Sequence, residues 1–242
     1  MRKKTLLLGL LLMSLVGLVL TQKDYSTDVF QTSKGDLKIT PIGHGSVMME
    51  FEGKTIHIDP YSRVGDYSRL PKANLILITH DHSDHLDPKA IAAIRTEKTG
   101  LVLSEKCAET VEGGVIMKNG DTKTVQGIKI EAVPAYNIVH KRSSGEPYHI
   151  KGEGNGYILT FGDKRVYVAG DTENTPEMKA LTDIHIAFLP MNLPYTMSPE
   201  MVADAAKAFR PKFLYPYHYG RTDTSELVEL LKDVEGMAVR IR

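Results

Sequence analysis

The pattern of apolar and polar positions predicts that the chain begins with β-hairpins. Residues 36–40 alternate in polarity, and two apolar-rich runs at 46–51 and 54–59 are joined by Glu52-Gly53. Two such runs about a short glycine-containing turn are typical of paired strands. The polar stretch 61–74 then predicts a loop.

A short apolar run at 75–78 is rich in Leu and β-branched residues, which favours a buried strand over a helix. A helix is expected soon afterwards. Asp87 is suited to the N-cap and Pro88 to the first helical position, and Ile91 and Ile94 share one face.

The remaining pattern predicts further short elements and one long loop. We expect strands at 101–103, 129–133, 157–161, 165–169, 184–189, 213–215 and 238–242, and helices at 104–111, 176–181, 199–209 and 225–231. Between them, the polar segment 134–155 predicts a loop of about twenty residues, a length that is usually functional or mobile. Two β-rich halves with helices predict two sheets packed face to face and covered by helices, an α+β fold.

Composition limits what this fold can do. The 242 residues are 42% hydrophobic, enough to bury a core in one domain, which we place at 36–242 after a loose polar lead-in at 22–35. The formal net charge is zero, so no basic surface for nucleic acid is expected. The single cysteine, Cys107, cannot form an intramolecular disulfide.

Residues 1–21 have the pattern of an export signal. Arg2, Lys3 and Lys4 precede an apolar run at 5–20, which is short for a membrane span. We expect either a cleaved signal peptide or an N-terminal anchor, and hence a periplasmic or extracellular protein. Membrane contact is expected only through this segment if it stays uncleaved, and the oligomeric state is open.

Three of the nine histidines fall within six residues directly after the strand predicted at 75–78. In His80-x-His82 both imidazoles can point the same way and bind one ion, while Asp84 and His85 can face a second. Nitrogen and carboxylate ligands suit Zn²⁺, with Mn²⁺ or Fe²⁺ as alternatives. The cluster therefore predicts a metal site.

The segment His80-x-His82-x-Asp84-His85 after an apolar strand resembles the signature of the metallo-β-lactamase superfamily. Gly170-Asp171-Thr172 resembles that family's bridging aspartate, and the segment 217–220 resembles the one carrying its final histidine, here His218. The resemblance covers 36–242 and implies a four-layer αββα sandwich with a dinuclear metal site. Residues 42–46 and 54–60 are similar to the branch that includes ascorbate-6-phosphate lactonase, N-acyl phosphatidylethanolamine phospholipase D and uncharacterised bacterial hydrolases.

One ligand of the first ion is not fixed by the resemblance. Many relatives carry a third histidine where this chain has Asn137. His149 is the favoured replacement, His140 is a second candidate, and Asn137 or water is a third. In the diiron flavoprotein relatives a glutamate stands at the position of His82, so the histidine here favours hydrolysis over redox chemistry.

The predicted activity is hydrolysis of an ester, lactone, amide or phosphodiester in a small-molecule or lipid-derived substrate. Two cations sharing Asp171 lower the pKa of a bound water, so that metal-bound hydroxide is available near neutral pH. Asp84 is expected to bind metal and also to orient the nucleophile. The alternatives are a lipid-directed phosphodiesterase and a metal-binding protein without turnover; no pocket residue argues for a true β-lactamase.

Other residues are assigned more weakly. His44 is a partner of the metal ligands, a residue that faces the substrate, or a turn residue held by backbone. Arg142 and Tyr195 are candidates for substrate contact or ordinary surface residues. Two further groups are expected to be structural or to line the core and cleft: His57 and His185, and Met48, Met49 and Met191.

Overall fold

The computed structural model describes residues 24–242, and the predicted export signal at 1–21 lies outside this range. Two seven-stranded sheets form the centre. The first contains, in spatial order, β1 (Asp28–Thr32), β2 (Gly35–Gly43), β3 (Ser46–Phe51), β4 (Lys54–Ile58), β5 (Leu75–Leu77), β6 (Gly100–Leu103) and β7 (Val115–Ile116). The second contains β8 (Thr122–Val125), β9 (Ile128–Ala135), β10 (Gly154–Phe161), β11 (Lys164–Val168), β12 (Ile186–Pro190), β13 (Phe213–Tyr217) and β14 (Ala238–Val239).

Each sheet begins with antiparallel hairpins and ends with parallel strands. Strands β4 to β7 are parallel in the first sheet, and β11 to β14 are parallel in the second. The carboxyl ends of parallel strands lie at one edge of a sheet. Residues that follow β4, β5, β11 and β13 are therefore brought to one edge from both sheets.

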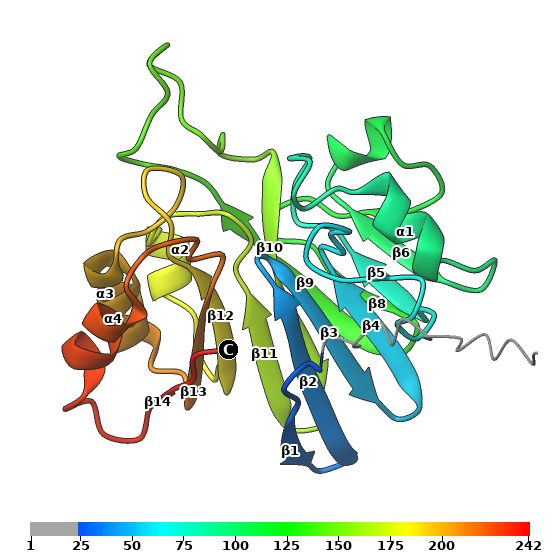
Figure 1. The fold of residues 1–242 in the computed structure, drawn as a ribbon, viewed down its shortest axis with the longest axis horizontal. Helices are drawn as coiled ribbons and strands as arrows, with labels where there is room; N and C mark the ends of the chain where they lie inside the picture. Colours follow the sequence, from blue (N-terminus) through cyan, green and yellow to red (C-terminus); the bar gives the residue numbers. More distant parts are fainter. Residues whose placement is uncertain (1–23) are drawn as a thin grey trace, which may run out of the picture.

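The layers follow the burial of apolar side chains. Tyr157, Phe161 and Phe188 of the second sheet belong to one buried cluster with Ile56 and Leu75 of the first, so the main core lies between the sheets. The helices α1 (Pro88–Ile94), α2 (Pro176–Lys179), α3 (Pro199–Phe209) and α4 (Thr224–Leu231) pack on the outside (Figure 1). The predicted four-layer αββα sandwich is confirmed.

Helix α1 starts as the sequence predicts. The Asp87 side chain accepts hydrogen bonds from the backbone N–H groups of Lys89 and Ala90, and Pro88 occupies the first turn. Ile91 and Ile94 are buried against the outer face of the first sheet. The cap and the apolar face thus fix both the start and the orientation of the helix.

The segment predicted to be a loose lead-in contains strand β1. Phe30 is buried, and its ring lies 4.9 Å from that of Phe213 in the second sheet. Asp28 forms ion pairs with Arg240 at 2.9 Å and Arg242 at 2.8 Å. The strand is held by contacts with residues near the other end of the chain. These contacts could not be predicted from its own polar sequence.

The helix predicted at 104–111 is wrong. The segment forms only a short 3₁₀ turn at Cys107–Glu109, with Cys107 buried. A single turn has few hydrogen bonds to offset the cost of nucleation. Gly113 follows at a φ of +78°, which keeps the chain from continuing as a helix.

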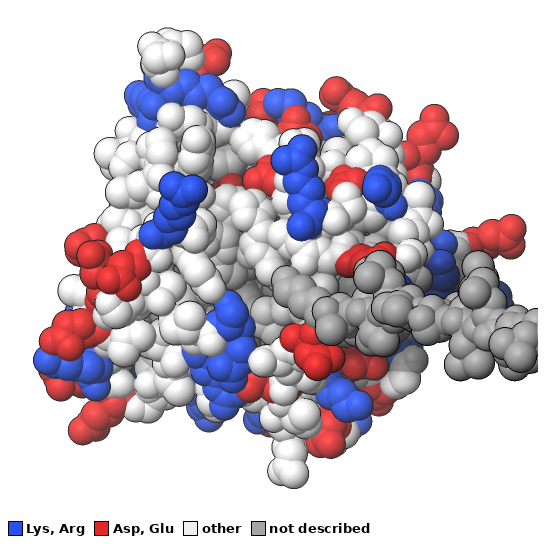
Figure 2. All heavy atoms as spheres, viewed as in Figure 1, with Lys and Arg blue, Asp and Glu red and all other residues white. Residues whose placement is uncertain are grey.

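Two further observations concern the distribution of surface charge and the length of the helices. Figure 2 shows acidic and basic side chains interspersed over the face in view, with no large area of one sign. Within residues 24–242, no helix is both long and apolar enough to cross a membrane.

Candidate metal centre

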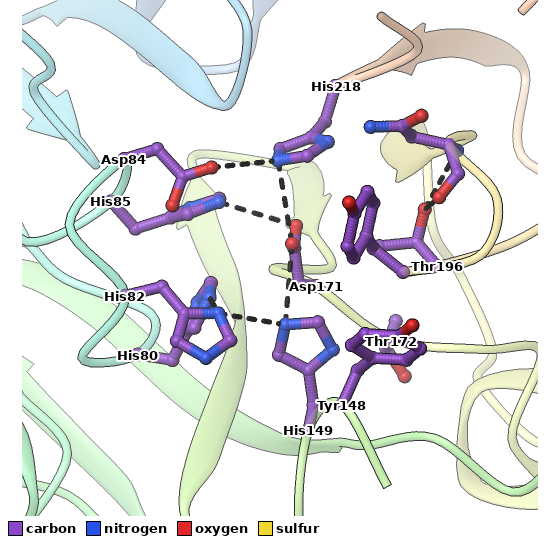
Figure 3. A network of polar contacts seen from close by, with 12 residues as sticks. His80, His82, Asp84, His85, Tyr148, His149, Asp171, Thr172, Thr196 and His218 are labelled. Carbon is purple, nitrogen blue, oxygen red and sulfur yellow. Dashed lines mark hydrogen bonds and ion pairs between the residues drawn. The ribbon is translucent and has the colours of Figure 1, made fainter. Parts of the chain in front are cut away.

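Six loops at one edge of the two sheets carry a cluster of histidines and aspartates. Figure 3 shows His80, His82, Asp84, His85, His149, Asp171 and His218 pointing toward one another. The loop after β5 supplies His80, His82, Asp84 and His85. The rest come from other loops: His44 between β2 and β3, Asp59 after β4, His149 between β9 and β10, Asp171 after β11, and His218 after β13. The structure therefore brings together all seven of the predicted metal ligands, from both sheets.

The first group consists of His80, His82 and His149. The Nδ1 atom of His82 lies 3.1 Å from His80 Nε2 and 3.2 Å from His149 Nε2. The potential ligand atoms of these three residues all lie within 4.8 Å of one another. This spacing fits three nitrogen ligands around one cation.

The second group contains Asp84, His85 and His218, which the sequence predicted, together with His44. His44 Nε2 lies 2.8 Å and His218 Nε2 lies 3.4 Å from Asp84 Oδ2. Of the predicted roles for His44, the structure shows that of a partner to a metal-ligand candidate, Asp84. Its turn conformation, with φ of +52°, is one that few residues other than glycine adopt.

Asp171 lies between the two groups. Its Oδ2 atom is 3.5 Å from His149 Nε2 of the first group and 3.5 Å from His218 Nε2 of the second. Its Oδ1 atom is 3.4 Å from His85 Nε2. One carboxylate thus faces both groups, which is the arrangement needed to bridge two cations.

The hydrogen-bond partners of the imidazoles leave lone pairs directed into the centre. Thr79 donates its hydroxyl proton to Asp59 at 2.6 Å, so its oxygen accepts from His80 Nδ1 at 3.0 Å. Asn137 Oδ1 accepts from His149 Nδ1 at 2.7 Å. Both Nε2 atoms therefore carry lone pairs, and these converge on one nitrogen of His82.

The second group contains buried polar atoms that lack hydrogen-bond partners. Asp59 Oδ2 accepts from His85 Nδ1 at 2.8 Å, which directs the other ring nitrogen, His85 Nε2, into the centre. That atom, His218 Nε2 and Asp171 Oδ1 are buried and form no hydrogen bond with the part of the chain at 24–242. Buried polar atoms without partners are costly unless a ligand satisfies them. The donor set and its orphaned atoms fit divalent cations.

The protonation states also suit cations. Burial lowers the pKa of His149 to about 4 and holds the pKa of His80 well below its usual value, so both rings are neutral at pH 7. Burial opposes ionisation of Asp171, but the neighbouring His218 and His85 outweigh it and bring its pKa well below the usual range. Neutral His80 and His149 beside an ionised Asp171 are in the forms that metal ions require. His85 differs: burial opposes its protonation, but Asp171 and Asp59 outweigh burial and raise the pKa of His85 well above its usual value, so a cation bound at its Nε2 atom would displace a proton.

Two glycines allow the close packing of the centre. A Cβ atom at Gly45 would lie 2.7 Å from Cε1 of the His85 ring, so any larger residue would displace that imidazole. Gly170 has a φ of +66°, and a Cβ there would lie 3.0 Å from both the Asn155 carbonyl oxygen and Thr79 Cβ. Glycine at these positions lets the turns approach the metal-ligand candidates.

A buried hydrogen-bond network holds His149 in place. It also shows which of His149, His140 and Asn137 faces the first group of ligands. Asn137 accepts from the backbone N–H of His149 at 2.9 Å as well as from its ring. Its amide nitrogen donates to Glu173 at 3.1 Å, and His140 Nδ1 lies 2.7 Å from the same carboxylate oxygen. The structure thus places His149 in the cluster, with Asn137 behind it and His140 directed away.

Glu173 is the fixed end of this network. Its side chain is fully buried and accepts at 2.7 Å from each of the backbone N–H groups of Ile138, Val139 and His140. Burial opposes its ionisation, but the backbone donors outweigh it and lower the pKa of Glu173. The carboxylate fixes the start of the long loop that carries His149.

We expect Glu173→Gln to lower both the stability of the metal-free protein and its affinity for zinc. The amide would present a donor to backbone N–H groups that need an acceptor, which costs about 1–3 kcal/mol. Zinc affinity should fall by about 10- to 100-fold, as for other outer partners of metal ligands. Urea unfolding and competition with a chromophoric chelator measure the two effects.

Glu177→Gln is the matched control for this substitution. Glu177 forms a partly exposed ion pair with Lys151, so its loss should cost less than about 1 kcal/mol and leave zinc affinity unchanged. Equal zinc affinities in the two variants would show that Glu173 does not position His149.

The sequence did not single out Asp59 or Glu173, although a signal existed for each. Asp59 follows an apolar strand just as Asp171 does, and Glu173 stands two residues after Asp171. Their roles depend on contacts with residues far along the chain, His85 and the backbone of 138–140.

The more weakly assigned residues divide into two sets. His57 is buried in β4 with its Nε2 atom 3.1 Å from the Pro71 carbonyl oxygen, and His185 Nδ1 accepts from the Arg165 backbone N–H at 3.3 Å. Met48, Met49 and Met191 are buried in apolar clusters. By contrast, Arg142 and Tyr195 line a cavity of about 500 Å³ beside His82, Asp84 and His218.

Comparison with known proteins gives a consistent result. The family model described as "Beta-lactamase superfamily domain" matches residues 38–218. The chain is 31% identical over 200 residues to the UPF0173 metal-dependent hydrolase of Methanopyrus kandleri, covering 76% of this chain and 84% of that protein. It is 29% identical over 220 residues to the UPF0173 metal-dependent hydrolase of Anoxybacillus flavithermus, covering 85% and 97%.

Solved structures agree with this result. A crystal structure of a candidate metal-dependent hydrolase from Parabacteroides distasonis is 51% identical, with a TM-score of 0.86 and coverage of 90% of this chain and 99% of that one. The structure of a metallo hydrolase from the archaeon Ignicoccus hospitalis is 26% identical, with a TM-score of 0.70 and coverage of 85% and 94%.

Proposed function

Because this chain belongs to the metallo-β-lactamase superfamily and is a metal-dependent hydrolase, we propose that it binds two divalent ions, with zinc the preferred metal. The proposed reaction is hydrolysis of an ester, lactone, amide or phosphodiester bond. The ligands would be His80, His82 and His149 for one ion and Asp84, His85 and His218 for the other, with Asp171 shared.

The position of Asp171 carries this proposal. A site for one ion would not need a carboxylate whose single Oδ2 atom lies 3.5 Å from an imidazole of each group. The lone pairs of His80 and His149 already provide for a cation on one side. A dinuclear centre requires two groups of ligands with one aspartate between them, as found here.

When bound, such ions supply Lewis acidity and a water of lowered pKa. The chain's own residues orient the reactants. Burial opposes ionisation of Asp84, but the neighbouring His218 and His44 outweigh this and lower its pKa, so it is ionised and can orient a water molecule. Asp59 holds His85 by its Nδ1 atom, and Asn137 holds His149 in the same way.

We further propose that the protein acts outside the cytoplasm. The support is the basic start and apolar run in residues 1–20. Fractionation of cells that produce the full chain, with N-terminal sequencing of the product, tests this. Recovery of the uncleaved chain in the cytoplasmic fraction alone would contradict export.

Metal removal is the main test of the function. We expect the purified protein to hold about two metal ions, and chelation to abolish hydrolysis of a panel of p-nitrophenyl esters, phosphodiesters and lactones. Added Zn²⁺ should restore activity in the parent protein but not in His82→Ala, which lacks a ligand of the first group. Metal binding without hydrolysis of any panel member would favour the alternative, a metal-binding protein without turnover.

A further inference from the structure

Two adjoining cavities open at the metal centre and share part of their walls. One has a volume of about 500 Å³ and the other of about 220 Å³. Arg142 and Tyr148 line both, beside His82 and His149. A substrate bound at the centre would therefore contact these two residues.

Arg142 is the cation that remains available to a substrate. Within residues 24–242 it forms no ion pair with a carboxylate; its Nη2 atom donates to the Tyr148 carbonyl oxygen at 3.2 Å and lies 3.5 Å from His82 Nε2. Lys106, in the smaller cavity, is instead paired with Glu153 at 2.8 Å and Asp81 at 3.7 Å. An unpaired guanidinium beside the centre is suited to an anion.

The long loop holds Arg142 in this position. Its backbone N–H donates to the Glu146 carbonyl oxygen at 2.7 Å, within a hairpin that projects beyond the sheets between β9 and β10 (Figure 1). The guanidinium lies 5.1 Å from the centre of the Tyr148 ring, which in turn lies 5.1 Å from the Tyr195 ring. The loop at 192–196 therefore closes the other side of the cavity.

These two loops also carry most of the exposed large apolar side chains. Nine such residues occur in the described chain, and five belong to the loops: Ile138, Val139, Ile150, Leu193 and Tyr195. Of these five, Ile150 lines the smaller cavity and Tyr195 lines the larger one. Val139 is 68% exposed and Ile150 is 42% exposed. Apolar residues gathered beside a polar site are typical of a ligand-binding surface.

From these observations we propose that the substrate is an anionic phosphodiester with an apolar substituent. Arg142 would contact the phosphoryl oxygens, and the apolar side chains that line the cavities, Ile150 and Tyr195, would contact the substituent. The guanidinium lies beside His82, so an anionic group bound to Arg142 would sit at the metal centre. We therefore expect the negative charge to be on the group that is hydrolysed. This inference rests on the proposed hydrolytic function.

The reaction is a hydrolysis without any further reactant. Water forms a new P–O bond and one ester P–O bond breaks. The departing oxygen takes a proton to leave as an alcohol, and the other product is a phosphate monoester.

Matched pairs of substrates test both parts of the proposal. We expect the zinc-loaded full chain to hydrolyse hexyl p-nitrophenyl phosphate with a KM about tenfold or more below that of methyl p-nitrophenyl phosphate, because added methylene groups leave water. Arg142→Ala should raise KM for both diesters by about tenfold, the loss expected for one charged hydrogen bond. KM for neutral p-nitrophenyl hexanoate should change less than about twofold.

Control variants separate these effects from general damage. Lys141→Ala removes the neighbouring exposed cation, which lines neither cavity, and should leave every KM unchanged. Arg142→Lys should recover part of the lost affinity. Ile150→Ser should remove most of the advantage of the hexyl group, whereas Val228→Ser, at an exposed residue of α4, should not.

A binding measurement keeps the inference independent of turnover. If no substrate is hydrolysed, the proposed function fails, but calorimetry with hexyl phosphate and methyl phosphate still tests the binding surface. Equal affinities for the two, or an Arg142→Ala variant that binds both as the parent does, would overturn the inference. Preferred hydrolysis of neutral esters would overturn it as well.

Two sources could supply such an amphiphile, a lipid in a bilayer or a dispersed molecule. Vesicles of phosphatidylglycerol distinguish them. Loss of vesicle binding in a double variant, Val139→Ser with Ile150→Ser, but not in Val228→Ser, would support the proposal with a membrane lipid as the source. Unchanged vesicle binding, with the hexyl preference retained in solution, would support it with a dispersed molecule as the source.

Discussion

Asp171→Asn should lower the rate of hydrolysis by about a thousandfold or more, the largest effect expected of any single change here. Its carboxylate faces both groups of ligands, so the amide would weaken both proposed metal positions at once. Lewis-acid stabilisation by bound metal is worth several kcal/mol, and each 1.4 kcal/mol corresponds to about a factor of ten in rate. Metal content by mass spectrometry and kcat/KM measure the two losses.

Asp204→Asn provides the comparison. Asp204 is an exposed carboxylate of α3 that pairs with Lys179 at 3.1 Å, so its loss should leave metal content and rate unchanged. If Asp171→Asn retained two metal ions and most of its activity, the shared carboxylate would not be the link between the groups.

His149→Ala should bind only one of the two proposed metal ions at micromolar zinc. It deletes one of three imidazoles from the first group, and the loss of affinity should exceed the 10- to 100-fold typical of an outer partner. His140→Ala is the direct control, because His140 is on the same loop but is held by Glu173. It should cost about 1–3 kcal/mol of unfolding free energy and keep both ions.

The reverse pattern would reassign the third ligand. Retention of two ions in His149→Ala, together with loss of one in His140→Ala, would mean that the loop rearranges when metal binds. The titration should therefore be made on both variants with the same chelator, and circular dichroism should show that each is folded.

The first part of the centre was predictable because its residues are contiguous. His80 to His85 follow an apolar strand directly, so their spacing already indicates shared ions, and the capped start of α1 fixes where the segment ends. The layered architecture was predictable for a related reason. Most strands and helices carry their own periodic pattern and turn residues.

The parts that were missed or left open depend on distant contacts. Strand β1 exists because Phe30 packs on Phe213 and Asp28 pairs with Arg240, none of which is visible in residues 22–35 alone. His149 lies in a loop whose path is set by Glu173, so spacing could rank it above His140 but could not place it in the cluster. Local pattern does not determine such contacts.

The division of the centre between two sheets has a consequence for how the chain acquires its final shape. His80 and His85 follow a strand of the first sheet, and Asp171 and His218 follow strands of the second, so the proposed ions would link the two halves of the protein. Neither half can form the complete centre before the sheets have docked, and metal capture should therefore come late in folding. Bound zinc would then slow amide hydrogen exchange most where the two halves meet, at the ends of β5 and β13.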